Sequence, residues 1–405
     1  MSRLPLAGKT IVLGVSGSIA VYKAAELASR LVQLGAQVDT VMTRGAAEFV
    51  RPLTFQALTH RPVVTDMFDP RSEISIDHVA LAKRADAVLL APATAQLIAR
   101  LALGLADDAV TATVLATAAP LIICPAMETR MYQHPATQAN LQRLREWGAV
   151  IVPPAAGRLA SGEEGIGRLA DPGTIIGTVR WVLGRAGDLA DRRIVVTAGG
   201  TREALDPVRF ITNRSSGKMG HALAAAARDR GARVTLITTV APDAETAAGV
   251  AVERVSSALE MMAAVERAVA EADALIMAAA VADFRPEAAA AEKVKKGDAE
   301  AWELRLVRNP DILASVQGPF IKVGFAAETS NVRANALAKL QAKGLHMIVA
   351  NDVTEPGSGF ETDTNRVTIY HAGGEVEDLP LLPKVDVAHA ILDRLVRLFS
   401  GSRLV

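Results

Sequence analysis

The chain has 405 residues, half of which are apolar, and its 44 Lys plus Arg residues balance 44 Asp plus Glu. This length and apolar content are enough to fill two cores of roughly 150 to 200 residues each, so we expect two domains. The balanced charge excludes a global field that would attract nucleic acid or an anionic membrane, and it leaves small anions held by local charge clusters as the expected ligands.

Cysteine usage and apolar runs narrow the class of protein further. Cys124 is the single cysteine, which excludes an internal disulfide framework and a cysteine-based structural zinc site. The N-terminal residues lack the features of a signal peptide, and no apolar run approaches the length of a bilayer span. We therefore expect a cytoplasmic protein that has neither nucleic acid nor a membrane among its partners.

The first half alternates short apolar runs with helix-forming segments. Residues 10–15 are an apolar run that ends in Ser16-Gly17-Ser18, and residues 20–34 carry helix formers with apolar spacing. Further strands are predicted at residues 38–43, 87–91, 120–124 and 150–152. Strands that alternate with helices predict an α/β fold, with a mostly parallel sheet and helices on both faces.

A second copy of the pattern begins after Leu183. Residues 184–193 are polar and contain glycine, and residues 194–200 again form an apolar run that ends in glycines. We place a domain boundary in the polar segment, which gives domains 1–187 and 188–405. The two halves also share short similar stretches, which indicate either a repeated architecture or the common needs of buried strands.

The most informative loop is the polar, glycine-punctuated segment 206–220, which lies between a β-rich run and an alanine-rich helical stretch. Its small hydroxyls, Ser215 and Ser216, and its backbone N–H groups stand at a predicted helix N-terminus, where an anion is favoured. A solvated connection is the alternative, but loops so polar and glycine-rich usually serve a site. The sequence therefore predicts a phosphate site.

Polar residues also follow three strands of the first half. Ser16-Gly17-Ser18, Thr43 and Thr94 stand at strand ends, and the carboxyl ends of parallel strands share a crevice. The Gly-Ser turn lacks Gly-x-Gly-x-x-Gly, and alone it is more typical of a tight connection. His78, just before a predicted helix, is by its residue type more often a capping or surface imidazole than a catalyst.

In the second half, Asp283 ends a predicted strand that begins at Met277, and a basic run begins near Lys293. Charge runs are usually solvated surface. Here, however, a carboxylate suited to Mg²⁺ and a lysine suited to a phosphate lie in one segment, as nucleotidyl transfer requires. Lys339 and Lys343 are four residues apart, and so are expected on one helical face.

Together these motifs resemble a known family. The first half resembles the flavin-dependent cysteine decarboxylases in residues 14–23, His78-Val79, residues 91–95, Ala106-Asp107-Asp108 and residues 125–132. The second half resembles the phosphopantothenate-cysteine ligases. From about Gly8 to about Leu398, the chain is similar to the bifunctional phosphopantothenoylcysteine decarboxylase/phosphopantothenate-cysteine ligases of coenzyme A biosynthesis. The resemblance implies two Rossmann-like domains, with a flavodoxin-like decarboxylase domain first.

For the first domain the resemblance implies FMN, which oxidises the cysteinyl thiol side, with His78 as the base or orienting imidazole of this first phase. Decarboxylation follows, and the reduced flavin then returns its electrons to give 4'-phosphopantetheine. An imidazole that titrates near neutrality suits that task. The FMN contacts implied are Gly17, Ser18, Ile19, Thr43, Ala93, Thr94 and Ala95.

Two positions of the first domain depart from the family pattern. Glu128 stands where the family commonly has an asparagine that binds the substrate carboxylate, and an ionised glutamate would repel that group. Glu128 must therefore be protonated, turned away or differently employed. Ser161 stands where many members have a cysteine, in a segment that resembles a mobile flap. Because a hydroxyl is a far weaker acid than a thiol, we hypothesise that Ser161 or a relayed proton serves the reduction step.

For the second domain the resemblance implies that CTP activates 4'-phosphopantothenate as an acyl-cytidylate, with loss of pyrophosphate. The amine of cysteine then attacks this intermediate to give 4'-phosphopantothenoylcysteine. Asn213 holds the intermediate, Lys293 is catalytic and Asp283 holds Mg²⁺. The CTP contacts implied are Met277, Ala278, Ala279, Asp283, Lys293, Pro310, Asp311, Ile312, Leu313, Phe325, Lys339 and Lys343.

The resemblance also implies homo-oligomers, with a trimer-based decarboxylase core and ligase dimers. Two other functions remain open. A flavin-binding regulatory protein would keep the fold without decarboxylase chemistry, and Glu128 and Ser161 favour it. Paired α/β domains are also typical of dinucleotide-dependent dehydrogenases. However, no Gly-x-Gly-x-x-Gly motif follows the first strand of either half.

Overall fold

The computed structural model describes residues 4–68, 77–295, 302–359 and 361–401. The chain forms two compact units, the first ending at Leu183 and the second beginning at Gly184. The boundary that we propose from the sequence, at residues 187 and 188, falls just after this point. Within the described ranges, no helix is both long and apolar enough to cross a membrane.

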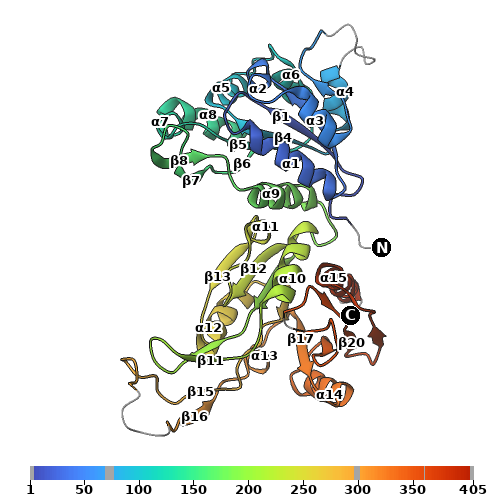
Figure 1. The fold of residues 1–405 in the computed structure, drawn as a ribbon. Helices are drawn as coiled ribbons and strands as arrows, with labels where there is room; N and C mark the ends of the chain where they lie inside the picture. Colours follow the sequence, from blue (N-terminus) through green and yellow to red (C-terminus); the bar gives the residue numbers. More distant parts are fainter. Residues whose placement is uncertain (1–3, 69–76, 296–301, 360, 402–405) are drawn as a thin grey trace. The chain divides into compact units, whose positions relative to one another are not determined.

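The first unit is built on a six-stranded parallel sheet with the order β3-β2-β1-β4-β5-β6. Figure 1 labels β1, β4, β5 and β6 of this sheet. The strand order is that of a doubly wound dinucleotide-binding sheet, in which the chain changes direction between the first and fourth strands. The predicted α/β class is confirmed. The strands are β1 (Thr10–Val15), β2 (Gln37–Met42), β3 (Val63–Val64), β4 (Ala87–Ala93), β5 (Leu121–Pro125) and β6 (Val150–Ile151).

Helices cover both faces of this sheet, and a hairpin follows its last strand. The helices are α1 (Val21–Gln33), α2 (Arg44–Ala47), α3 (Pro52–Thr59), α4 (Asp77–Arg84), α5 (Ala95–Ala102), α6 (Ala109–Ala116), α7 (Thr129–Gln133), α8 (Pro135–Glu146) and α9 (Pro172–Gly184). The hairpin consists of β7 (Ala155–Arg158) and β8 (Glu164–Arg168).

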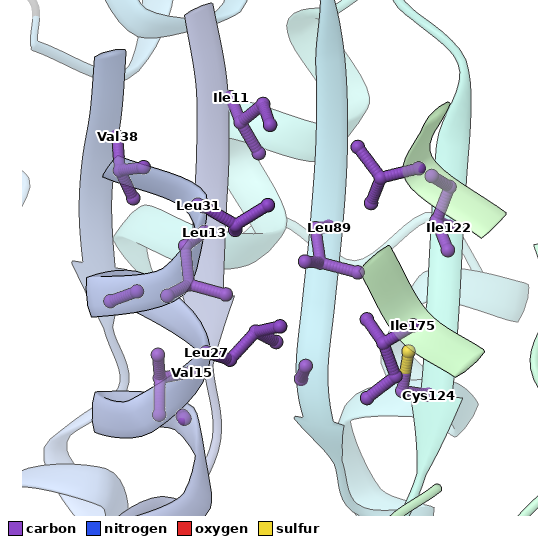
Figure 2. Packing of buried hydrophobic residues seen from close by; sticks show 14 of the residues in the cluster. Ile11, Leu13, Val15, Leu27, Leu31, Val38, Leu89, Ile122, Cys124 and Ile175 are labelled. Carbon is purple, nitrogen blue, oxygen red and sulfur yellow. The ribbon is translucent and has the colours of Figure 1, made fainter. Parts of the chain in front are cut away.

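The alternation of side chains along β1 explains the two cores of the first unit. Leu13 and its alternate neighbours point to one face, where α1 contributes Leu27 and Leu31, as Figure 2 shows. The side chain of Val12 belongs to the cluster on the other face, together with apolar residues of α4, α5, α6 and α8. Helix α1 forms because its buried residues recur at helical spacing.

The second unit repeats this arrangement and extends it. Its eight-stranded sheet has the order β13-β12-β9-β14-β17-β18-β20-β21, and the first six strands follow the same parallel order as the first sheet. Strands β20 and β21 are added antiparallel at one edge. The strands are β9 (Arg193–Ala198), β12 (Arg233–Thr238), β13 (Ala251–Arg254), β14 (Ala274–Met277), β17 (Ile321–Glu328), β18 (Met347–Asp352), β20 (Thr368–His371) and β21 (Val376–Asp378).

Helices α10 and α15 pack on one face of the second sheet, and α12, α13 and α14 pack on the other. The helices are α10 (Lys218–Asp229), α11 (Ala244–Ala247), α12 (Ala258–Val269), α13 (Ile312–Ser315), α14 (Val332–Ala342) and α15 (Lys384–Gly401). Short pairs of strands complete the unit: β10 (Arg202–Ala204) with β11 (Phe210–Thr212), β15 (Phe284–Pro286) with β16 (Leu306–Arg308), and β19 (Thr364–Asn365) with β22 (Leu382–Pro383).

Some elements differ from the sequence-based prediction. The segment 206–220, predicted as one loop, contains β11, which pairs with β10 in a hairpin. His78 lies inside the first turn of α4 rather than before that helix. In both places a few residues form local hydrogen bonds that a pattern of polar and glycine residues does not reveal.

The strand predicted to run from Met277 to Asp283 was a wrong prediction, because β14 ends at Met277. Beyond that residue, the backbone N–H groups of Ala279 and Ala282 donate to threonine hydroxyls, at 3.1 Å and 2.9 Å. An apolar run therefore continues past the sheet as irregular backbone, which a hydropathy pattern cannot distinguish from a strand.

Because each unit has its own cores, each should unfold separately. We expect Leu31→Ala to lower the unfolding free energy of the first unit by about 2–5 kcal/mol, the range for a buried leucine. Leu392→Ala, in the core of the second unit, is the matched control. Scanning calorimetry should show two transitions, each shifted by one substitution only, whereas a single transition shifted by both would contradict separate cores.

Candidate active sites in the two units

In the first unit, Ser16 joins the carboxyl ends of the neighbouring strands β1 and β4. Its hydroxyl donates to the carbonyl of Pro92 at 2.8 Å and accepts from the backbone N–H of Thr94 at 2.9 Å. Thr94 in turn caps α5 through its own hydroxyl, which accepts from Leu97. These bonds fix the crevice between β1 and β4, the switch point where doubly wound sheets bind ligands.

The third predicted strand end lies against the first. Thr43 caps α2, and its backbone N–H donates to the carbonyl of Val15 at 3.0 Å. A Cβ atom on Gly17 would lie 2.8 Å from the carbonyl carbon of Gly45. The loop after β1 and the loop after β2 therefore lie so close together that only glycine fits at position 17. The structure brings the predicted strand ends Ser16–Ser18, Thr43 and Ala93–Ala95 together.

A cavity of about 630 Å³ opens beside these strand ends. This volume is within the range of small-molecule sites. Ser18, Ile19, Glu128 and Ser161 line it, whereas Gly17, Thr43, the residues 93–95 and His78 do not. Its further lining residues are Ala20, Tyr22, Lys23, Ala126, Met127, Arg158, Leu159, Ala160, Gly167, Arg168 and Leu169.

The β7–β8 hairpin forms one wall of this cavity, and glycines allow it to dock. The backbone N–H of Met127 donates to the carbonyl of Gly167 at 3.0 Å. A Cβ atom on Gly167 would lie 2.1 Å from the carbonyl oxygen of Met127, and one on Gly165 would lie 2.2 Å from the hydroxyl of Thr129. The hairpin therefore needs glycine at both positions to rest on the loop before α7.

The carboxylate of Glu128 is differently employed, one of the three outcomes that the sequence allows. Its Oε2 accepts from the backbone N–H groups of Arg130 and Met131, at 2.7 Å and 3.3 Å, so Glu128 caps α7. A negative charge is favoured at this end of a helix. Glu128 thus lines the cavity while its carboxylate turns toward the backbone of its own chain.

Of the other candidate proton-transfer residues in the first unit, only Ser161 lines the cavity. Ser161 is exposed at the tip of the β7–β8 hairpin. His78 does not line the cavity, and its Nδ1 is buried without a hydrogen-bond partner among the described residues. Cys124 is fully buried, which raises the pKa of its thiol far above the ordinary value. It therefore does not replace the cysteine missing at position 161.

In the second unit, a cavity of about 790 Å³ lies at the corresponding switch point, between β9 and β14. It collects every residue predicted to contact CTP except Lys293. Asn213, predicted to hold the acyl intermediate, also lines it. The predicted residues that line the cavity are Asn213, Met277, Ala278, Ala279, Asp283, Pro310, Asp311, Ile312, Leu313, Phe325, Lys339 and Lys343.

Threonine hydroxyls hold the irregular segment after β14 in place. The hydroxyl of Thr201 accepts from the N–H of Ala282, just as Ser16 accepts from Thr94 in the first unit. Gly200 pairs with Ala280 in an isolated bridge, and its Cβ would lie 2.6 Å from the carbonyl oxygen of Asn213. The cavity wall is therefore fixed by backbone contacts that exclude a side chain at position 200.

Two asparagines cross-link the walls of this cavity. The amide of Asn213 donates to the carbonyl of Val281 at 3.1 Å. The amide of Asn309 donates to the carbonyl of Ala282 at 2.8 Å. The loop before α10 and the loop before α13 are thus both tied to the segment after β14, which positions the side chains on that segment.

Both predicted lysines of the cavity already have carboxylate partners. The Nζ atom of Lys339 lies 2.7 Å from Glu328, and that of Lys343 lies 2.9 Å from Asp311. Burial would raise the pKa of Glu328, but hydrogen bonds from Lys339 and Asn335 outweigh it and hold the pKa low. A bound anion must therefore share or displace these partners.

Asp283 is exposed at the cavity, as an ion-binding carboxylate requires. Mg²⁺ is commonly held by one or two carboxylates together with substrate phosphates, so the residues present fit such an ion. Lys293 is exposed and does not line the cavity. Its neighbour Val294 donates its N–H to the buried carboxylate of Asp206 at 3.2 Å, which fixes the segment that carries Lys293.

Sequence reasoning missed several polar residues at both cavities. Arg158 and Arg168 are the last residues of β7 and β8 in the hairpin of the first unit, and the flap resemblance includes them without giving them a role. In the second unit Lys218 belongs to the predicted phosphate loop, but Asn365 and Lys384 come from distant segments. No local pattern marks those two residues, because only the tertiary fold brings them to the cavity.

The chain is similar to proteins of coenzyme A biosynthesis over nearly all of its length. The Flavoprotein family model matches residues 2–184, and that of the DNA/pantothenate metabolism flavoprotein C-terminal domain matches residues 189–398. The chain is 48% identical over 396 residues to the coenzyme A biosynthesis bifunctional protein CoaBC of Vibrio parahaemolyticus, covering 96% of this chain and 98% of that protein. It is 46% identical over 400 residues to the protein of that name from Escherichia coli K12, covering 97% and 98%.

A solved structure is also similar. It is the crystal structure of the C-terminal domain of a coenzyme A biosynthesis bifunctional protein CoaBC, with 39% sequence identity and a TM-score of 0.44. The match covers 53% of this chain and 99% of that one.

Docking of the β7–β8 hairpin predicts a clear effect of Gly167→Ala. The new Cβ cannot coexist with the carbonyl of Met127, so we expect the hairpin to open and trypsin to cleave after Arg158 at least roughly tenfold faster. Gly373→Ala, at a position without a left-handed φ where a Cβ meets nothing within 4 Å, is the control. Equal cleavage of Gly167→Ala and the unsubstituted protein would show that the docking contact is unimportant.

Proposed function

We propose that this chain, which belongs to the family of bifunctional coenzyme A biosynthesis proteins, performs two successive reactions in the cytoplasm. The second unit ligates cysteine to 4'-phosphopantothenate at the expense of CTP. The first unit then decarboxylates the resulting 4'-phosphopantothenoylcysteine to 4'-phosphopantetheine with the help of FMN. The family membership supplies both activities, and the substrates, nucleotide and residue roles are our assignment.

One observation carries the ligase assignment. Residues from four distant segments, which the family resemblance alone connects with CTP, line a single cavity at the switch point of the second sheet. Segments that are distant in the sequence and unrelated in function would not be expected to line the same cavity. The volume of about 790 Å³ is of the size that a nucleotide and a small acyl substrate require.

The geometry supports the following roles in the ligase. The carboxylate of 4'-phosphopantothenate attacks the α-phosphorus of CTP, and pyrophosphate leaves. Asp283 would hold a Mg²⁺ ion that neutralises the charge developing on the phosphates. Lys339 and Lys343 would bind the nucleotide by exchanging their present partners, the carboxylates of Glu328 and Asp311, for oxygens of the nucleotide. The amide of Asn213, fixed by Val281, would orient the acyl-cytidylate for attack by the amine of cysteine.

The first unit offers a site that fits FMN. Close glycines, helix caps and small hydroxyls meet at the carboxyl ends of β1, β2 and β4, which suits a phosphate and a flat ring. When bound, the flavin supplies the two-electron redox chemistry that the decarboxylation needs. We assign its binding to Gly17, Ser18, Ile19, Thr43, Ala93, Thr94 and Ala95.

The protein residues of the decarboxylase position the substrate and handle its protons. His78 would take or orient the thiol proton of the cysteinyl group. Ser161 would donate, directly or through water, the proton that completes the reduced product. The capping role of Glu128 takes its charge away from the substrate carboxylate, which weakens one reason to favour a regulatory protein without activity.

We further propose that the chain forms homo-oligomers. His78 does not line the cavity that Glu128 and Ser161 share within one chain. We infer that a site combining all three draws residues from two copies, as in a trimer-based decarboxylase core. Ligase dimers would be the second contact of such an assembly.

Nucleotide and cation dependence test the ligase assignment. Purified protein with 4'-phosphopantothenate, cysteine and Mg²⁺ should release pyrophosphate with CTP and not with ATP, GTP or UTP. Asp283→Asn should lower kcat/KM for CTP by roughly 100-fold or more, because the cation loses its protein ligand. The exposed carboxylate of Glu271, which pairs with Arg193, supplies the control Glu271→Gln. Equal activity of both variants would contradict the role of Asp283.

The proton donor of the decarboxylase is tested at position 161. Ser161→Ala should slow formation of 4'-phosphopantetheine by roughly 100-fold, the scale of a general acid, while release of carbon dioxide changes less. Ser161→Cys should form product faster than the unsubstituted protein, because a thiol is the stronger acid. If product forms at the same rate in Ser161→Ala, Ser161 is not the donor.

A further inference from the structure

One end of the cavity in the second unit contains two cations that the nucleotide assignment does not use. Lys384 begins α15 and is 6% exposed, and its Nζ donates to the carbonyls of Gly359 and Thr362 at 2.9 Å and 2.5 Å. An ammonium group has three donors, so one remains. Because Lys384 lines the cavity, this donor is available to a ligand.

Lys218 reaches the same short segment of chain from another helix. It begins α10, and its Nζ lies 2.6 Å from a carboxylate oxygen of Asp363 and donates to the carbonyl of Glu361 at 3.0 Å. Burial and then the charge of Lys218 lower the pKa of Lys384, while Asp363 opposes them. Two ammonium groups thus repel each other beside a cavity, and an anion bound there would relieve the repulsion.

A buried amide adds neutral donors to the pair. Asn365 is 5% exposed and lines the cavity. Its side-chain oxygen accepts from the hydroxyl of Ser358 at 2.9 Å, which leaves the NH₂ group as the free end of the amide. Among the described residues this NH₂ group has no acceptor. Because Asn365 borders the cavity, this NH₂ group can donate to an acceptor of a bound ligand.

We propose that Lys384, Lys218 and Asn365 bind the terminal phosphate of 4'-phosphopantothenate, as a site separate from the nucleotide. This inference rests on the proposed ligase function. A phosphate monoester carries close to two negative charges near neutral pH, which two ammonium groups match. Of the lysines assigned to CTP, Lys339 and Lys343 are paired with Glu328 and Asp311, whereas Lys218 and Lys384 share only Asp363.

The direct test measures binding without turnover. Isothermal calorimetry on the full chain, in the absence of nucleotide, should show tighter binding of 4'-phosphopantothenate than of pantothenate, which lacks the phosphate. Lys384→Met and Asn365→Asp should each reduce that preference by roughly 10- to 100-fold, the effect of a charge-assisted hydrogen bond. Binding of CTP should change by less than about twofold.

Lys322→Met is the matched control, since Lys322 is 5% exposed and its Nζ donates to the carbonyl of Leu313 without lining the cavity. It should leave the preference for the phosphate unchanged. If Lys384→Met does not fold, Asn365→Asp and Lys218→Met carry the test. An unchanged preference in the folded variants, or an equal loss of CTP binding, would overturn the proposal. A chain without pyrophosphate release that still shows the preference would instead refute only the ligase function.

Discussion

The close approach of backbone at the switch point of each sheet is the constraint on which both sites depend. In each unit, a hydroxyl just after the first strand accepts from a backbone N–H just after the fourth strand, from Ser16 in one and Thr201 in the other. Glycines beside these hydroxyls, Gly17 and Gly200, leave no room for a Cβ. Small residues are therefore required where the chain opens its crevice, and the ligand-binding edge follows from the strand order.

The two units use the same frame for different chemistry. In the first, a hairpin docks through Gly165 and Gly167 on Thr129 and Met127 and forms one wall of the cavity. In the second, two antiparallel strands and the helix α15 extend the sheet, and they bring Lys384 and Asn365 to the cavity. The second site thereby gains a lysine and an amide from its C-terminal segment, while Lys23, Arg158 and Arg168 are the cations that line the first cavity.

The sequence predicts the architecture well because hydrophobic alternation in buried strands is a strong, local pattern. The strands at residues 10–15, 37–42 and 193–198 lie where the apolar runs predict them. The candidate site is predicted in part, since strand ends converge by geometry once the sheet is parallel. The end of β14 at Met277 was not predictable from the sequence. The backbone N–H groups of the segment that follows β14 donate to the hydroxyls of Thr197 and Thr201, which lie about 80 residues earlier in the chain.

Contributions from remote segments were beyond sequence reasoning as well. Lys384 reaches the cavity only because α15 packs on the same face as α10, and Glu128 turns from the crevice only because α7 begins directly after it. Composition and spacing give no indication of either. Lys293 shows the reverse case, in which a basic run near the site remains outside the cavity lining.

Hydrogen exchange of the full chain with one ligand at a time tests the central claim that each unit carries its own phosphate-binding crevice. FMN should protect backbone amides of residues 16–20, 43–46 and 93–97, and CTP with Mg²⁺ should protect residues 277–284 and 308–313. Protection of each set by its own ligand alone is the predicted result. Both ligands protecting the same unit, or neither protecting these strand ends, would contradict the account.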